Sequence, residues 1–190
     1  MLPDWDRCFP GVPPIGHDLR EGFPERWARF HSLPGSRRYP ADQADHDELL
    51  MRHHVILGEL ARPGDRVVLV TTGYSESATP VRDCPELAEL DPLAAHWRTV
   101  AMHEHEGILD ETNYWHFFAS TWAWRTGTFD RIVRLVAEDM VGNVLIVASD
   151  CRWLLHPYDG GMDVIAGSPA ERDRLKDRRQ AWLPEGRAGL

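Results

Sequence analysis

The chain of 190 residues contains a single lysine, Lys176, so arginine supplies nearly all of its positive charge. Acidic side chains outnumber basic ones, and the formal net charge is −9 at pH 7. Proteins that bind nucleic acid present a basic face to the phosphate backbone, so this balance argues against nucleic acid as a partner. It permits a basic protein partner, and the alternative is that the acidic charge only keeps the protein soluble.

Cysteine and long apolar runs are also scarce. Cys8, Cys84 and Cys151 are widely spaced and include no Cys-x-x-Cys pair, which indicates free thiols in a reducing cytosol. No apolar run approaches the ~18 residues that a membrane-spanning helix needs. The N-terminus carries Asp4 and Asp6 and lacks an apolar region, so it does not read as a signal peptide. We therefore expect a cytoplasmic protein without a membrane partner.

The aromatic run at residues 114–124 is the most readable stretch. In an extended strand, alternate side chains point to opposite faces, and here the side chains of both faces are largely apolar. This pattern is typical of a strand that is covered on both faces. A 3.6-residue apolar pattern then predicts a helix at 128–140 with Thr128 as its N-cap, and residues 144–148 read as a buried strand. Strand, helix and strand with short links predict a right-handed βαβ unit.

The C-terminal part of the chain predicts a hairpin of strands 152–156 and 162–166, followed by a helix at 169–182. Ser168, Pro169 and Glu171 supply N-cap, N1 and N3 residues for that helix. With a further helix at 42–61, the pattern predicts an α/β (α+β) fold, a mixed sheet of five to seven strands with helices packed on it. We expect a single domain over residues 1–190. Within it, residues 1–24 form an irregular, Pro- and Gly-rich segment and residues 25–190 form the core.

One locally basic segment, residues 29–39, is the predicted ligand site. Guanidinium groups with nearby hydroxyls can hold a carboxylate or phosphate, and the turn at 158–161 brings two carboxylates that can serve the same ligand. The alternative is structural, because loop arginines commonly pair with carboxylates such as Asp42 and Asp45. The candidate ligand-binding residues are Arg29, His31, Ser36, Arg37, Arg38, Tyr39, Asp159 and Asp163.

No cofactor fingerprint is present, and a divalent metal is the one alternative to a cofactor-free protein. On an extended segment His103 and His105 point the same way, so both imidazoles can reach one ion. The third ligand would be Asp110, Glu111 or His116. The competing interpretation is that two histidines on an exposed acidic segment are simply solvated.

Residues 73–77, Gly-Tyr-Ser-Glu-Ser, follow a strong strand and echo a nucleophile elbow. Ser77 replaces the last glycine of that motif, and Pro80 stands where an apolar helix should begin. We therefore interpret this stretch as a polar loop.

The aromatic strand places Trp122 in the core, and we expect Trp122→Ala to cost more stability than Trp5→Ala in the N-terminal segment.

Residues 154–166, Leu-Leu-His-Pro-Tyr-Asp-Gly-Gly-Met-Asp-Val-Ile-Ala, followed by a capped helix ending near Trp182, resemble the C-terminal module of a family of uncharacterised bacterial proteins. Residues 29–39 also resemble proteins of unknown function from GC-rich bacteria. Gly160 stands where those relatives often have Asp or Arg. The resemblance implies no activity, although small acidic α/β proteins of this kind are often encoded near toxin genes.

Two functions remain open from the sequence. The first is a binding protein without a complete catalytic constellation, with an immunity-like role against a basic protein partner. The second is a small metal-dependent or anion-recognising enzyme that uses His103 and His105 or the segment 29–39. Convergence of the candidate ligand residues in one place would favour the second.

Overall fold

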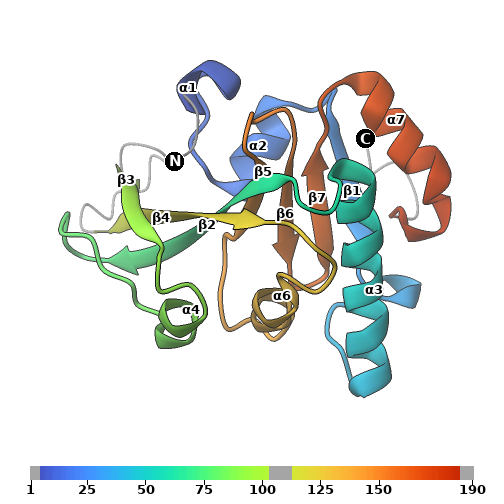
Figure 1. Cartoon of the computed structure of the whole chain (residues 1–190), viewed down its shortest axis with the longest axis horizontal. Helices are drawn as coiled ribbons and strands as arrows, with labels where there is room; N and C mark the ends of the chain where they lie inside the picture. The colour runs from blue at the N-terminus through green and yellow to red at the C-terminus, as the bar shows by residue number, and fades with distance from the viewer. Residues whose placement is uncertain (1–4, 103–112, 185–190) are drawn as a thin grey trace.

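The computed structural model describes residues 5–102 and 113–184, which form one seven-stranded sheet with helices on both faces (Figure 1). Every pairing of neighbouring strands in the described chain is antiparallel, in the order β1-β7-β6-β5-β2-β4-β3. The expected fold class, helices packed on a single sheet with a C-terminal hairpin and helix, is confirmed. The strands are β1 (Trp27–His31), β2 (Arg66–Ser75), β3 (Ala95–Ala101), β4 (Tyr114–Ala123), β5 (Leu145–Ala148), β6 (Leu154–Tyr158) and β7 (Gly161–Ile165).

The strands of the expected βαβ unit are parallel, but they are not neighbours. β4 and β5 are joined through α6 (Asp130–Ala137), and β2 lies between them, antiparallel to both. The sheet therefore has no parallel neighbours among the described strands, where a mixed sheet was expected. β2 can take this central position because its residues 67–73 are buried on both faces.

The helices begin largely where their capping residues predict. Asp42 caps α3 by accepting a hydrogen bond from the Asp45 backbone N–H at 3.0 Å, and Ser168 caps α7 in the same way. Thr128 does not cap α6: its hydroxyl accepts the Arg125 backbone N–H at 3.0 Å, and α6 begins two residues later. The helices are α1 (Trp5–Cys8), α2 (Gly16–Gly22), α3 (Gln43–Leu60), α4 (Pro85–Leu90), α6 and α7 (Pro169–Arg178), with 3₁₀ turns at Pro34–Ser36 and Gln180–Trp182.

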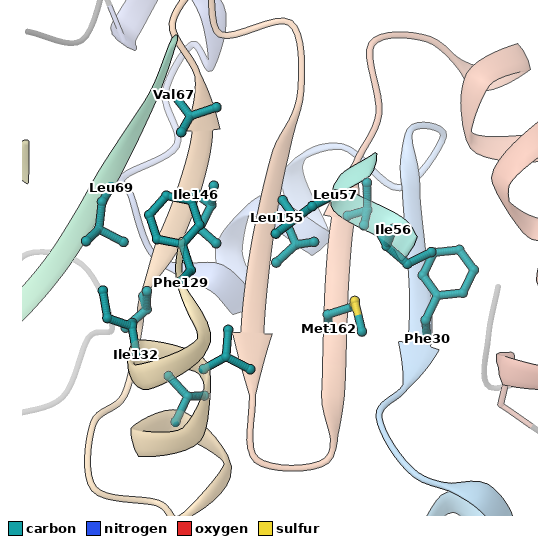
Figure 2. Packing of buried hydrophobic residues seen from close by; sticks show 14 of the residues in the cluster. Phe30, Ile56, Leu57, Val67, Leu69, Phe129, Ile132, Ile146, Leu155 and Met162 are labelled. Atoms are coloured by element: carbon teal, nitrogen blue, oxygen red, sulfur yellow. The ribbon is translucent and has the colours of Figure 1, made fainter. Parts of the chain in front are cut away.

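The larger core lies between one face of the sheet and helices α3 and α6. Figure 2 shows Ile56 and Leu57 of α3 beside Phe30 and Met162, and Ile132 of α6 below Ile146 and Leu69. These side chains are at most 3% exposed. Burying such a side chain stabilises the fold by roughly 1.5–3 kcal/mol, so this layer fixes the positions of β1 and β7 at one end of the sheet.

The N-terminal segment covers the opposite face, and it is more ordered than its Pro and Gly content predicts. It contains two short helices, α1 and α2. Trp5, Phe9 and Leu19 are at most 2% exposed and pack in one cluster with Leu154 of β6. The Trp5 indole N–H donates to the Val12 carbonyl oxygen at 2.8 Å. The segment is thus a layer of the fold.

Cys8, Cys84 and Cys151 form no disulfide with one another, as expected from their spacing. Burial raises the pKa of the Cys151 thiol to about 12, and a hydrogen bond with Cys8 acts in the same direction. In the described part of the chain, no helix combines the length and apolar character needed to cross a membrane.

Candidate functional site

Strand register brings Arg29 and Asp163 together. Arg29 of β1 lies directly opposite Asp163 of β7. Its Nε and Nη2 each donate to one carboxylate oxygen of Asp163 at 2.8 Å, a bidentate ion pair. The guanidinium also lies over the rings of Trp27, at 5.3 Å, and Tyr158, at 4.9 Å. Hydrogen bonding to Asp163 raises the pKa of Arg29, so the guanidinium stays charged.

A second ion pair forms at the turn between β6 and β7. The Arg38 Nε donates to the Asp159 carboxylate, and the Tyr39 hydroxyl donates to the same oxygen at 3.1 Å. The hydrogen bond to Asp159 raises the pKa of Tyr39. The Ser32 backbone N–H donates to the Gly160 carbonyl oxygen at 3.2 Å, which fastens the end of β1 to this turn.

The remaining residues of the segment 29–39 do not join these pairs. Arg37 turns to α3 and makes two hydrogen bonds to Asp45, at 2.5 and 2.6 Å. The Arg37 guanidinium, with the Ala41 backbone N–H, lowers the pKa of Asp45 to about 2. His31 is linked through its carbonyl oxygen, which accepts from Arg52 at 3.0 Å, and Ser36 is exposed with a φ of 56°.

The three arginines of the predicted site are therefore each paired with a carboxylate of this chain. Arg29, Arg38, Tyr39, Asp159 and Asp163 do converge on the β1–β7–β6 end of the sheet. An anionic ligand would compete with carboxylates already in place, so the geometry supports the structural alternative for Arg37 named from the sequence. A ligand-binding role for this set stays a prediction.

His156 of β6 lies beside this cluster, opposite Asp163 on the sheet. A Cβ on Gly16 of α2 would lie 2.2 Å from the His156 ring, so only glycine lets α2 approach so closely. Burial lowers the pKa of His156 to about 4, and Nδ1 has no hydrogen-bond partner among the described residues. The imidazole is therefore neutral at pH 7 and acts as packing surface under α2.

A chain of hydrogen bonds connects β2, β4 and β3, and only His116 and Ser75 among its members could be singled out from the sequence. His116 of β4 lies opposite Gly73 of β2 and Thr99 of β3. Its Nε2 lies 2.8 Å from the Ser75 Oγ and its Nδ1 lies 3.0 Å from the Thr99 Oγ1. The chain continues from Thr99 to the His96 Nε2 at 2.9 Å.

The direction of these hydrogen bonds decides what Ser75 can do. Burial lowers the pKa of His116, so the ring is neutral, with one donor and one acceptor nitrogen. Ser75 Oγ also lies 2.9 Å from the Ser77 carbonyl oxygen. One arrangement of the protons satisfies all these hydrogen bonds. The His96 imidazole donates to the Thr99 hydroxyl, which donates to His116. His116 then donates to the Ser75 hydroxyl, which donates to the Ser77 carbonyl oxygen. In that direction His116 donates to Ser75 and does not act as its base, which argues against a nucleophile elbow. Gly73, Tyr74 and Ser75 belong to β2, so the expected polar loop begins only after Ser75.

The proposed metal ligands His103 and His105 lie outside the described residues, as do Asp110 and Glu111. His116, the third candidate ligand that the structure describes, has both nitrogens engaged by hydroxyl groups. Within residues 5–102 and 113–184, no group of three or more His, Cys, Asp or Glu side chains is placed to hold a metal ion.

Residues 76–93 form a strongly acidic segment that contains α4 and the loop before it. This segment lies at the β3 end of the sheet (Figure 1). It contains five carboxylates and one arginine. Arg82 points inward, because its guanidinium donates to the carbonyl oxygens of Asp91 and Leu87 at 2.9 Å. Asp91 is buried and accepts from the Ser120 hydroxyl at 2.5 Å. The four exposed carboxylates are those of Glu76, Asp83, Glu86 and Glu89.

Two apolar side chains accompany these carboxylates. Leu93, three residues after the end of α4, is 85% exposed, and Val81 in the loop before α4 is 44% exposed. Single exposed aliphatic side chains are common on protein surfaces, but these two lie in the same segment as the four exposed carboxylates. The acidic segment thus combines exposed negative charge with exposed apolar side chains.

A family model described as "Domain of unknown function (DUF3885)" matches residues 15–186 of the chain. No curated protein and no solved structure matches this chain.

Proposed function

The chain belongs to this family, DUF3885, whose function is unknown, and we propose that it is a binding protein whose acidic segment, residues 76–93, recognises a basic protein partner. The observation that carries the proposal is the local charge. The segment's only cation, Arg82, is used by its own backbone carbonyls, and four carboxylates face outward. A basic surface would neutralise them on docking.

The apolar side chains supply what charge alone does not. Rim charges mainly speed association and select the partner, whereas buried apolar anchors slow dissociation. Leu93 and Val81 are the exposed apolar side chains that flank α4, which carries Glu86 and Glu89. We therefore infer an interface in which basic side chains of the partner surround a pocket that accepts Leu93.

The alternative of an anion-recognising enzyme has less support. Its proposed arginines, Arg29, Arg37 and Arg38, are already bound to Asp163, Asp45 and Asp159. The excess negative charge of the chain then remains on its surface, where it favours a cationic partner.

The test starts with capture of partners from a lysate of the host cell on the immobilised protein, followed by purification of each retained protein. Binding is then measured for the wild type, for Glu86→Lys/Glu89→Lys and for Leu93→Ser. We expect a basic partner whose affinity falls by about tenfold or more in each variant, since one lost hot-spot contact is worth ~1.4 kcal/mol or more.

The matched control is Glu21→Lys/Glu25→Lys, which changes the net charge equally at exposed positions on and after α2. It should retain nearly all of the affinity. Equal losses of affinity in both double variants would show that only the net charge matters. An unchanged affinity in Glu86→Lys/Glu89→Lys and in Leu93→Ser would disprove the proposed surface.

A further inference from the structure

A cavity of about 540 Å³ lies between the last turn of α3, helix α7 and the loop between β5 and β6. This region is at the end of the sheet opposite α4, far from the acidic segment (Figure 1). Its volume is within the range of small-molecule sites, ~300–1,000 Å³. Four arginines line it, Arg62, Arg152, Arg174 and Arg178, although the chain as a whole carries a net charge of −9.

Three of these arginines have little or no carboxylate partner. No described carboxylate pairs with the Arg62 guanidinium, although the Arg62 backbone N–H donates to Asp65. Arg152 lies 3.7 Å from Asp150 and Arg174 lies 3.9 Å from Glu171, and both arginine side chains are at least 60% exposed. Such pairs contribute little and are easily exchanged. Their guanidinium groups are therefore available to a ligand, unlike those of the segment 29–39.

Three carboxylates line the cavity. Those of Glu59 and Asp65 are committed to other groups, and Glu171 makes only the weak pair with Arg174. Glu59 accepts hydrogen bonds from Arg178 at 3.2 Å and from Arg179 at 2.5 and 2.8 Å, so two cations share one anion. Asp65 accepts the Arg62 backbone N–H at 2.8 Å. The cavity thus keeps a local excess of positive charge.

The base of the cavity is apolar. Trp153, 3% exposed, and Leu175, 5% exposed, belong to the main core and also line this space. The final turn of α3 also reaches the cavity, and the partial negative charge of its carbonyl groups opposes any anion there, so the affinity has to come from the guanidinium groups. An occupant must bind the guanidinium groups directly, through a planar pair of oxygen atoms, and cover the apolar base.

From these contacts we propose that the cavity between α3 and α7 binds a small organic anion, in which a phosphate or carboxylate group is held by Arg62, Arg152 and Arg174 and an apolar portion covers Trp153. The proposal is independent of the partner-binding function, because the two surfaces share no residue.

Two probes separate the two sources of the anionic group: phenyl phosphate and phthalate, each titrated calorimetrically against chloride of equal ionic strength. We expect saturable binding of at least one probe. Arg62→Gln should weaken it by about tenfold or more, because a charge-assisted hydrogen bond contributes ~1.5–3 kcal/mol. Arg62→Gln/Arg174→Gln should abolish it.

Arg131→Gln is the control, since Arg131 is exposed on α6 and does not line the cavity. It should bind the probe as the wild type does. Melting midpoints of all variants establish that they are folded. Absence of binding by both probes, or an affinity that is the same in Arg62→Gln/Arg174→Gln and the wild type, would overturn the proposal.

Discussion

Asp163→Asn tests whether the Arg29–Asp163 pair supports the fold or awaits a ligand. Asp163 is 4% exposed and the Arg29 side chain 25% exposed, so the pair is largely shielded from water. Asparagine keeps one acceptor but turns an NH₂ group toward the second guanidinium N–H. Removing one partner of a buried pair costs about 3–5 kcal/mol, and the partial exposure of Arg29 puts the expected loss near 3 kcal/mol.

Urea denaturation measures this loss as a lower midpoint at an unchanged slope. The double variant Arg29→Met/Asp163→Leu should recover most of it, because an apolar pair of similar volume avoids the cost of burying charge. Asp159→Asn is the comparison at the exposed pair with Arg38 and should barely move the midpoint. A loss below about 1 kcal/mol for Asp163→Asn would mean that the pair behaves as a surface ion pair and would refute the reasoning.

Three further outcomes are expected. Burial lowers the pKa of both His53 and His156 to about 4; since the unfolded chain takes up these protons near pH 6.5, stability is full above that pH and falls as the pH drops toward 4. The urea midpoint of His156→Gln should therefore depend less on pH between 6.5 and 4 than that of the wild type. The substitution His96→Gln, at an exposed position, should leave this pH dependence unchanged. Trp5→Ala should cost roughly 3–5 kcal/mol and Trp122→Ala less, since Trp5 is 2% exposed and Trp122 only partly buried; equal urea midpoints would contradict this order. A strong chelator should leave the melting midpoint unchanged, because the core is large and no group of ligating side chains in the described residues is placed to hold a metal ion; a drop of many degrees would reveal a structural ion.

Residues close in sequence were enough to predict most helices and strands. The order of the strands in the sheet depends on pairing between distant residues and could not be predicted in this way. The N-cap Ser168 and the apolar run of β4 could be read directly, because both depend on residues close in sequence. The insertion of β2 between β4 and β5 could not, since antiparallel pairing across such separations leaves no local pattern. Trp5 was misjudged for the same reason: its burial depends on strands more than sixty residues further along the chain.

The candidate site shows the same division. The sequence identified Arg29, Arg38, Asp159 and Asp163 as a group, and they do meet in space. Their mutual pairing was not readable, because the partners lie 134 and 121 residues apart. The arginines around the α3–α7 cavity come from three separate stretches, and no composition signal marks them as a set.

The place of β1 at the edge of the sheet has a consequence for the newly made chain. β1 hydrogen-bonds to β7 alone among the described strands, and the two are separated by about seven tenths of the polypeptide. At ~5–20 residues per second, β7 leaves the ribosome on the order of ten seconds after β1. Trp5 and Phe9 pack against strands that are also synthesised later. Trp5, Phe9 and β1 are therefore translated well before the strands that complete their contacts, and their aromatic side chains are open to chaperones during that interval.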